Sequence, residues 1–168
     1  MNLILCGMMG AGKTTIGIKL AARTGRRWYD TDELIIDKHG KISDIFEYYG
    51  EAHFRKIETA IVKDLAKMDN LVISTGGGLV LKKENNELLQ ENGKIVFLRA
   101  SLSTLAKRLK VDGERPLLQT STENIRDRLA RLLSERTPVY EHVADYIVDV
   151  DDKKPEEVAE EIIALINA

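Results

Sequence analysis

Cysteine, proline and aromatic residues are scarce in this sequence, which has one cysteine, three prolines, one tryptophan and three phenylalanines among 168 residues. The single cysteine, Cys6, excludes a disulfide framework and a four-cysteine zinc site. No apolar run approaches the ~18 residues of a membrane-spanning helix, so we expect no membrane partner. The formal net charge of −2 argues against electrostatic binding to nucleic acid. No signal peptide is visible, and we expect a cytoplasmic protein.

The rest of the composition is that of an ordinary globular protein, with 43% hydrophobic and 31% charged residues. We expect a single domain over residues 1–168, and its small size favours a monomer. Apolar runs alternate with helical patterns, which predicts a three-layer α/β fold with a five-stranded parallel sheet and ligands at the carboxyl ends of its strands. The expected strands lie near 3–6, 28–29, 71–74, 95–98 and 146–148, and the expected helices near 13–23, 33–38, 43–49, 51–68, 83–91, after 101, 123–136 and from 155 onward.

Five residues are expected to delimit these helices. Gly25 fits the position just after the first helix, and Ser43 and Ser101 fit N-caps. Pro155 fits the first turn of the last helix, whereas Pro138 is expected to interrupt the helix before it.

The stretch from Gly7 to Thr14 reads Gly-Met-Met-Gly-Ala-Gly-Lys-Thr and lies between the first apolar run and a helical pattern. This spacing is that of a phosphate-binding loop, and the strand and helix around it make a chance match the weaker interpretation. Its glycines let successive N–H groups surround an anion, and the helix start adds a positive dipole end. We therefore predict that a nucleoside triphosphate binds here with Mg²⁺, through Gly10, Ala11, Gly12, Lys13, Thr14 and Thr15.

Many phosphate-loop proteins place an aspartate for Mg²⁺ at the end of the third strand, but here that strand ends Ser74-Thr75-Gly76. Asp30 and Asp32 are the nearest replacements at a strand end. Spaced i and i+2 in extended chain, they would point the same way, one toward Mg²⁺-bound water and the other toward an acceptor hydroxyl. The alternative for either aspartate is a helix N-cap.

Three successive glycines, Gly76, Gly77 and Gly78, follow the third expected strand. One interpretation is a tight turn between strand and helix. The other, which we favour, is that side chains are excluded so that a substrate can lie against the backbone.

Three arginines are candidates for holding a carboxylate or phosphate through two parallel hydrogen bonds. Arg115 lies in the polar segment 110–120, whose glycine and proline are typical of a mobile lid, and there it would close over the transferring phosphoryl group. From the residues alone, Arg55 and Arg136 are equally consistent with ordinary surface arginines.

Taken in order, these motifs resemble those of the shikimate kinases, small phosphate-loop kinases of the nucleoside-monophosphate-kinase-like group. The resemblance covers nearly the whole chain. It is carried by the loop GMMGAGKTT, D-T-D at 30–32, I-F and G-E-A-H-F-R-K-I-E within 45–58, S-T-G-G-G at 74–78, R-P-L-L at 115–118 and R-T-P-V-Y at 136–140.

The resemblance implies that ATP phosphorylates the 3-hydroxyl of shikimate, a step toward the aromatic amino acids. Asp32 would bind the acceptor hydroxyls and take the proton, while Lys13 and Arg115 would neutralise charge on the phosphates. Arg55 and Arg136 would clamp the substrate carboxylate. The substrate-binding set, much of it on helices over about 32–62, would be Asp32, Phe46, Phe54, Arg55, Gly76, Gly77, Gly78, Leu117 and Arg136.

On the nucleotide side, the resemblance implies that Arg108, Lys153 and Pro155 flank the adenine. Thr14 would bind Mg²⁺ directly, and Asp30 would support it through water. Two other functions stay open: a related kinase for gluconate or a nucleoside monophosphate, and a regulator that binds nucleotide without chemistry.

Overall fold

The structure is a computed structural model and describes residues 1–109 and 124–168. The expected lid over 110–120, with Arg115 and Leu117, lies outside the described residues. No helix in the part that the structure describes is long and apolar enough to cross a membrane.

Five parallel strands form one sheet in the order β2-β3-β1-β4-β5. The two central neighbours β1 and β3 are buried along their whole length, as their unbroken apolar sequences predict. Cys6 ends β1 as a buried core residue, and burial raises the pKa of its thiol to about 12. The strands are β1 (Asn2–Cys6), β2 (Arg27–Asp30), β3 (Leu71–Ser74), β4 (Gly93–Arg99) and β5 (Tyr146–Asp149).

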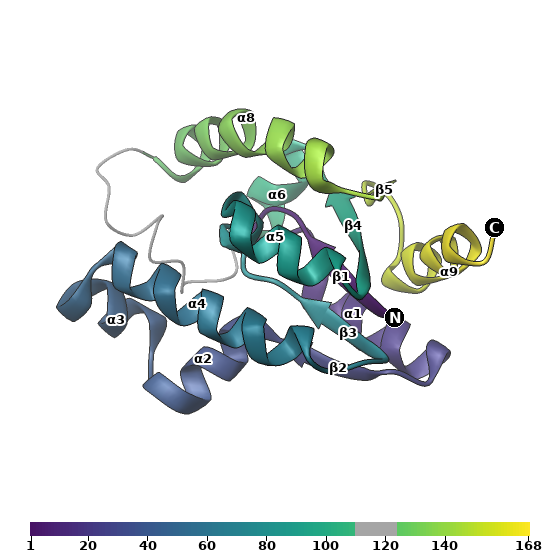
Figure 1. The fold of residues 1–168 in the computed structure, drawn as a ribbon. Coiled ribbons are helices and arrows are strands. Elements are labelled where there is room, and N and C mark those ends of the chain that lie inside the picture. The colour runs from purple at the N-terminus through teal and green to yellow at the C-terminus, as the bar shows by residue number, and fades with distance from the viewer. Residues whose placement is uncertain (110–123) are drawn as a thin grey trace.

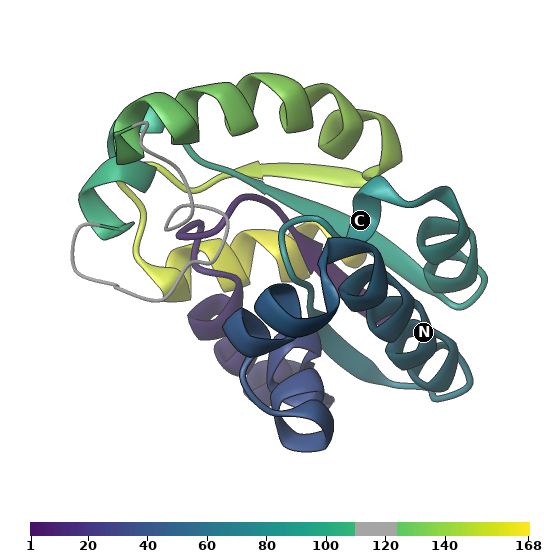
Figure 2. The same ribbon diagram turned by 90° about the vertical axis from the view of Figure 1, so that its left-hand side faces the viewer.

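Helices cover both faces of this sheet, which confirms the three-layer α/β prediction (Figures 1 and 2). Helices α1 (Lys13–Thr24) and α9 (Pro155–Ile166) pack together on one face. The other face carries α4, α5 and α8, with α2 and α3 packed beside α4. These helices are α2 (Thr31–His39), α3 (Ile42–Tyr49), α4 (Glu51–Ala66), α5 (Lys83–Gln90), α6 (Leu102–Leu109) and α8 (Ile125–Val143), and a short 3₁₀ turn, η1 (Leu79–Leu81), precedes α5.

Three of the expected helix boundaries are confirmed. Gly25 ends α1 in the left-handed conformation, with φ of 69°. The Ser101 hydroxyl accepts a hydrogen bond from the Thr104 N–H at the start of α6, and Pro155 occupies the first turn of α9.

Two expected boundaries are wrong. The N-cap of α3 is Lys41 rather than Ser43, so the helix begins at Ile42. Helix α8 runs through Pro138 without a break, although an internal proline costs about 3 kcal/mol because it removes one hydrogen bond and crowds the preceding turn. Arg136 and Tyr140, one on each side of the proline, are both buried, and their packing outweighs this local preference.

Because all five strands are parallel, their carboxyl ends share one edge of the sheet. The phosphate loop leaves β1 at this edge, Asp30 ends β2 and the triple glycine follows β3. The residues predicted to act together are therefore assembled by the topology of the sheet itself.

Candidate active site

The phosphate loop has the backbone that its sequence predicts. Gly10 and Gly12 have φ of 86° and 97°, conformations that side chains with a Cβ rarely adopt. The Lys13 ammonium group donates to the carbonyl of Gly7 at 2.6 Å, and the Arg108 guanidinium donates to the carbonyl of Gly10 at 3.0 Å. Two cations thus lie against the loop that is expected to receive phosphates.

The start of α1 is anchored to the sheet by a short chain of hydrogen bonds. The Trp28 indole N–H donates to the Ser74 hydroxyl at 3.0 Å, and that hydroxyl donates to the Lys13 carbonyl at 2.7 Å. Trp28 therefore lies against the start of α1. Ser74 occupies the strand end where a magnesium aspartate is absent, and here it holds the phosphate loop in place.

The two candidate metal-site residues lie side by side. The Thr14 hydroxyl donates to Oδ2 of Asp30 at 3.0 Å, while Oδ1 of Asp30 accepts from the N–H groups of Asp32 and Glu33. Asp30 is thus the N-cap of α2, and one of its oxygens also faces the loop. Because α2 begins at Thr31, the expectation that Asp30 and Asp32 share an extended chain is wrong.

This pair fits Mg²⁺, which takes hard oxygen ligands and usually needs only one or two from the protein beside phosphates and water. Among residues 1–109 and 124–168, no group of three or more histidine, cysteine, aspartate and glutamate side chains could form a protein-only metal site. A hydroxyl and a carboxylate oxygen next to a phosphate loop are the donors that such a shared site requires.

A pocket of about 280 Å³ opens beside the phosphate loop. It brings together five predicted nucleotide-binding residues, Gly12, Thr15, Arg108, Lys153 and Pro155. Its other walls are Ile16, Val150 and Val158, which the sequence did not single out as nucleotide-binding residues. The Lys153 ammonium group donates to Glu161 of α9 at 2.8 Å, so the loop after β5 is attached to the helix behind the pocket.

The triple glycine is the point at which the predicted acceptor residues converge. A Cβ on Gly76 would lie 2.8 Å from an Asp32 carboxylate oxygen, and one on Gly77 would lie 3.0 Å from Nη1 of Arg136. A Cβ on Gly78 would lie 2.5 Å from Nη2 of Arg55. Each glycine therefore faces a different charged side chain, and the missing Cβ atoms leave the space that these groups occupy.

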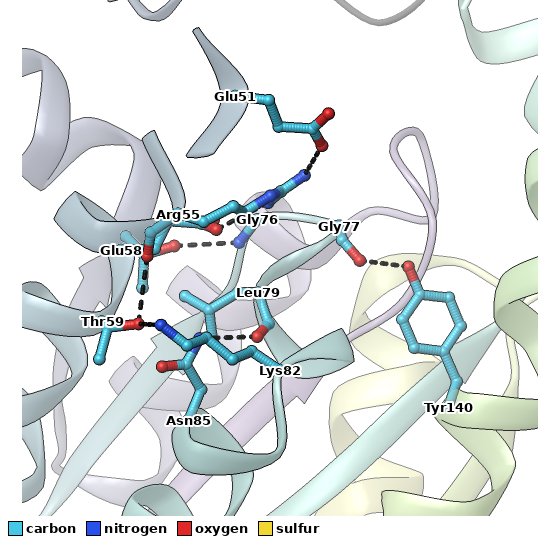
Figure 3. A network of polar contacts seen from close by, with 11 residues as sticks. Glu51, Arg55, Glu58, Thr59, Gly76, Gly77, Leu79, Lys82, Asn85 and Tyr140 are labelled. Carbon is cyan, nitrogen blue, oxygen red and sulfur yellow. Dashed lines mark hydrogen bonds and ion pairs between the residues drawn. The ribbon is translucent and has the colours of Figure 1, made fainter. Parts of the chain in front are cut away.

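Arg55 is held by two acidic residues on its own helix (Figure 3). It donates to Glu58 at 2.6 Å and to Glu51 at 3.1 Å. Burial raises the pKa of the Glu58 carboxyl, and the adjacent Arg55 opposes that rise. Burial acts to lower the pKa of Arg55, but its attraction to Glu58 and Glu51 leaves that pKa raised, so Arg55 stays charged. The sequence reasoning gave neither glutamate a role, although their i−4 and i+3 spacing from Arg55 was a readable signal.

Arg136 is buried yet incompletely paired. Its side chain is 6% exposed, and its Nη1 has no hydrogen-bond partner among the described residues. Buried polar groups nearly always have a partner, and a guanidinium N–H prefers a carboxylate or phosphate. Arg136 therefore presents an unused donor directly beside Gly77, which suits an anionic ligand.

The two predicted aromatic residues lie beside Arg55. The rings of Phe46 and Phe54 are 4.9 Å apart, and the Arg55 guanidinium lies 5.2 Å from the centre of the Phe54 ring. The apolar wall and Arg55 thus belong to the same pair of helices, α3 and α4, whereas Arg136 comes from α8.

The phosphate loop follows the central strand of this sheet, and the charged residues around the triple glycine lie at the same edge. This arrangement defines a phosphate-loop kinase of the nucleoside-monophosphate-kinase-like class. The Shikimate kinase family model matches residues 9–167. A shikimate kinase of Caldicellulosiruptor bescii is 44% identical over 98% of this chain and 94% of its own length. One from Vibrio parahaemolyticus is 42% identical over 98% and 95%. The chain belongs to the shikimate kinase family.

Solved structures agree with this family. Shikimate kinase from Acinetobacter baumannii in complex with shikimate superposes with a TM-score of 0.93 at 39% identity, covering 99% of this chain and 92% of that one. Shikimate kinase from Aquifex aeolicus superposes with a TM-score of 0.85 at 38% identity, covering 99% and 96%. The resemblance inferred from the motifs is therefore confirmed.

Proposed function

We propose that this chain catalyses transfer of the γ-phosphoryl group of ATP to the 3-hydroxyl of shikimate, a step toward the aromatic amino acids. The observation that carries the proposal is the buried, incompletely paired guanidinium of Arg136 beside Gly77, across the turn from Asp32 and Arg55. Such a donor suits a small carboxylated alcohol. Membership of the family, and a relative whose structure contains shikimate, support this choice of acceptor.

On the acceptor side, Arg136 and Arg55 bind the shikimate carboxylate, and Asp32 binds the hydroxyl that reacts. Arg55 is already paired with Glu58 and Glu51, so its orientation is set before the substrate arrives. Phe46 and Phe54 line the pocket, and Gly76–Gly78 present backbone to the ring of the substrate. Leu117, which lies outside the described residues, keeps its predicted place in the pocket as part of this proposal.

On the donor side, the phosphate loop binds the β- and γ-phosphates through its N–H groups and Lys13. Arg108, Lys153 and Pro155 line the pocket for the adenine. Thr14 and Asp30 would hold Mg²⁺, which supplies positive charge at the phosphates when it is bound. Arg115, which lies outside the described residues, is proposed from the sequence to neutralise the transferring group.

The chemical step needs positioning and charge neutralisation more than covalent help from the protein. The 3-hydroxyl oxygen forms a bond to the γ-phosphorus as the bond from that phosphorus to the β–γ bridging oxygen breaks. The hydroxyl proton passes to the Asp32 carboxylate, and ADP leaves with the electron pair of the broken bond. We also propose, from the sequence, that the protein acts as a monomer in the cytoplasm and that its 168 residues form one kinase domain.

A coupled assay of ADP release tests the proposal with shikimate, gluconate and AMP as acceptors at one MgATP concentration. Of the three acceptors, we expect only shikimate to give turnover. A Lys13→Met variant, which should be inactive, controls for contaminating kinases. Turnover with gluconate or AMP but not with shikimate would contradict the proposal that shikimate is the substrate. Binding of ATP and shikimate without ADP release would favour a regulator over an enzyme.

A further inference from the structure

Two buried hydroxyl groups hold the triple-glycine turn from opposite sides. The Thr31 hydroxyl accepts a hydrogen bond from the Gly76 N–H at 2.9 Å. The Tyr140 hydroxyl donates to the Gly77 carbonyl at 2.5 Å, as Figure 3 shows. Both side chains belong to residues that are fully buried, and neither is among the predicted substrate-binding or nucleotide-binding residues.

Each hydroxyl comes from the element that carries one of the charged groups of the site. Thr31 directly precedes Asp32 at the start of α2, and Tyr140 follows Arg136 by one turn of α8. The glycine that each hydroxyl binds is also the glycine that faces its charged neighbour: Gly76 faces Asp32, and Gly77 faces Arg136. The two bonds therefore set the distance between each charged group and the turn.

The turn needs such support because it has no side chains of its own to pack. Upstream, Thr75 is tied to β1, since its N–H and hydroxyl both donate to the Leu5 carbonyl. Downstream, Leu79 and Leu81 close the 3₁₀ turn by donating to Gly76 and Gly78. The Gly76 N–H and the Gly77 carbonyl point sideways out of this path, to Thr31 and Tyr140. Glycine backbone is conformationally permissive, and small displacements of a binding site are costly for catalysis.

We propose that Thr31 and Tyr140 are positioning residues: their hydroxyls hold the Gly76–Gly77 turn in register with Asp32 and Arg136 and so shape the acceptor site. The proposal rests on the proposed function of that site. Tyr140 is suited to the task because burial raises the pKa of its phenol to about 12, which keeps the hydroxyl protonated and able to donate. The hydroxyl also lies near the Arg136 guanidinium, because a Cβ on Gly77 would lie 3.0 Å from Nη1 of Arg136 and 3.7 Å from the Tyr140 hydroxyl oxygen.

The two residues serve different groups, so their variants should have different kinetic signatures. Tyr140→Phe keeps the ring and its 5.0 Å contact with Phe97 but removes the hydroxyl that holds the Gly77 carbonyl beside Arg136. We expect the KM for shikimate to rise roughly tenfold with kcat changed less than about threefold, because carboxylate binding is weakened in ground and transition states alike. Thr31→Val keeps the shape but leaves the Gly76 N–H unpaired next to Asp32. We expect kcat to fall roughly tenfold, because alignment of the reacting hydroxyl is lost.

Three comparisons separate positioning from a purely structural role. Thr31→Ser retains a hydroxyl and should restore kcat to within about threefold of the original protein. Thr24→Val removes a hydroxyl that donates to the Leu20 carbonyl at the far end of α1, and should leave both kinetic constants unchanged. In an Arg136→Ala background, Tyr140→Phe should raise the KM for shikimate by less than about twofold further, because its effect acts through Arg136.

The KM for ATP should stay within about twofold in Tyr140→Phe and Thr31→Val, since the phosphate loop is not touched. Equal changes in the KM for ATP and the KM for shikimate would overturn the positioning roles. So would a lower melting temperature with unchanged kcat and KM. If Thr31→Val does not fold, Tyr140→Phe and the Arg136→Ala cycle still test the role of Tyr140, and Thr31→Ser, whose kcat should stay within about threefold of the original protein, still tests the role of Thr31. An unmodified protein that does not phosphorylate shikimate would overturn the proposed function instead. The two failures are therefore distinguishable.

Discussion

Replacing Gly78 by alanine should damage the acceptor site through one identifiable contact. The backbone at this position has φ of −95° and ψ of −5°, which alanine adopts without strain. The new Cβ, however, would lie 2.5, 2.6 and 2.7 Å from the Nη2, Nη1 and Cζ atoms of Arg55. An ordinary contact requires at least 3.4 Å, so the Arg55 guanidinium would have to move by about 0.9 Å.

That movement cannot be absorbed freely, because Arg55 is held by Glu58 at 2.6 Å and Glu51 at 3.1 Å. Losing one hydrogen bond between charged partners costs about 1.5–3 kcal/mol. If the bond lost is the one to the substrate carboxylate, this corresponds to a rise of about 10- to 150-fold in the KM for shikimate. The KM for ATP should not change, since the phosphate loop lies on the other side of the site.

Steady-state kinetics of Gly78→Ala, Arg55→Ala and the double variant provide the test. Once Arg55 is truncated to alanine, the new methyl group has nothing to displace. Gly78→Ala should then raise the KM for shikimate by less than about twofold further. A normal shikimate KM in the single variant would refute the reasoning. So would an equally large effect of Gly78→Ala in the presence and absence of the Arg55 guanidinium.

Three further predictions follow from the same geometry. Asp32→Asn should lower kcat by about 10²–10⁴-fold with MgATP affinity unchanged, measured by turnover and calorimetry, and full activity would remove Asp32 from the mechanism. Arg136→Ala should weaken shikimate binding by about 2–5 kcal/mol, and an unchanged KM would contradict the carboxylate clamp. Because the folded-state pKa of Tyr140 is raised from 10.0 to about 12, its contribution to stability is present below pH 10 and is lost as the pH rises to 12. Urea unfolding should show a steeper alkaline loss in the original protein than in Tyr140→Phe, and identical slopes would refute this.

The residues that sequence reasoning located correctly are those whose signal is local. The phosphate loop, the glycine after α1 and the proline at the start of α9 each depend on neighbours within a few positions, so their conformations are readable in the chain. The start of α2 was readable as well, but was missed. Asp30 followed three residues later by Glu33 has the spacing of a capping box, and it places the helix start at Thr31 rather than at 33.

The errors and omissions arose where distant residues decide. Pro138 should end a helix by local rules, yet α8 continues because Arg136 and Tyr140 are buried on either side of it. The roles of Glu58 and Thr31 depend on contacts with side chains and backbone brought together by the sheet. Spacing along the chain names the partners of Arg55 on its own helix, but it does not show that Gly78 leaves room for its guanidinium.

By itself, the sequence determined the class of the protein: a phosphate-loop kinase of the shikimate kinase family, built on a parallel sheet. It did so because the loop, the strands and the ordered motifs are encoded by short stretches whose geometry is nearly independent of the rest. Only the tertiary structure decided how the acceptor site is supported. Three glycines meet Asp32, Arg136 and Arg55, and two buried hydroxyls hold the turn. This happens because the parallel strands end at one edge of the sheet, where α2 and α4, from the chain between β2 and β3, meet α8, from the chain between β4 and β5.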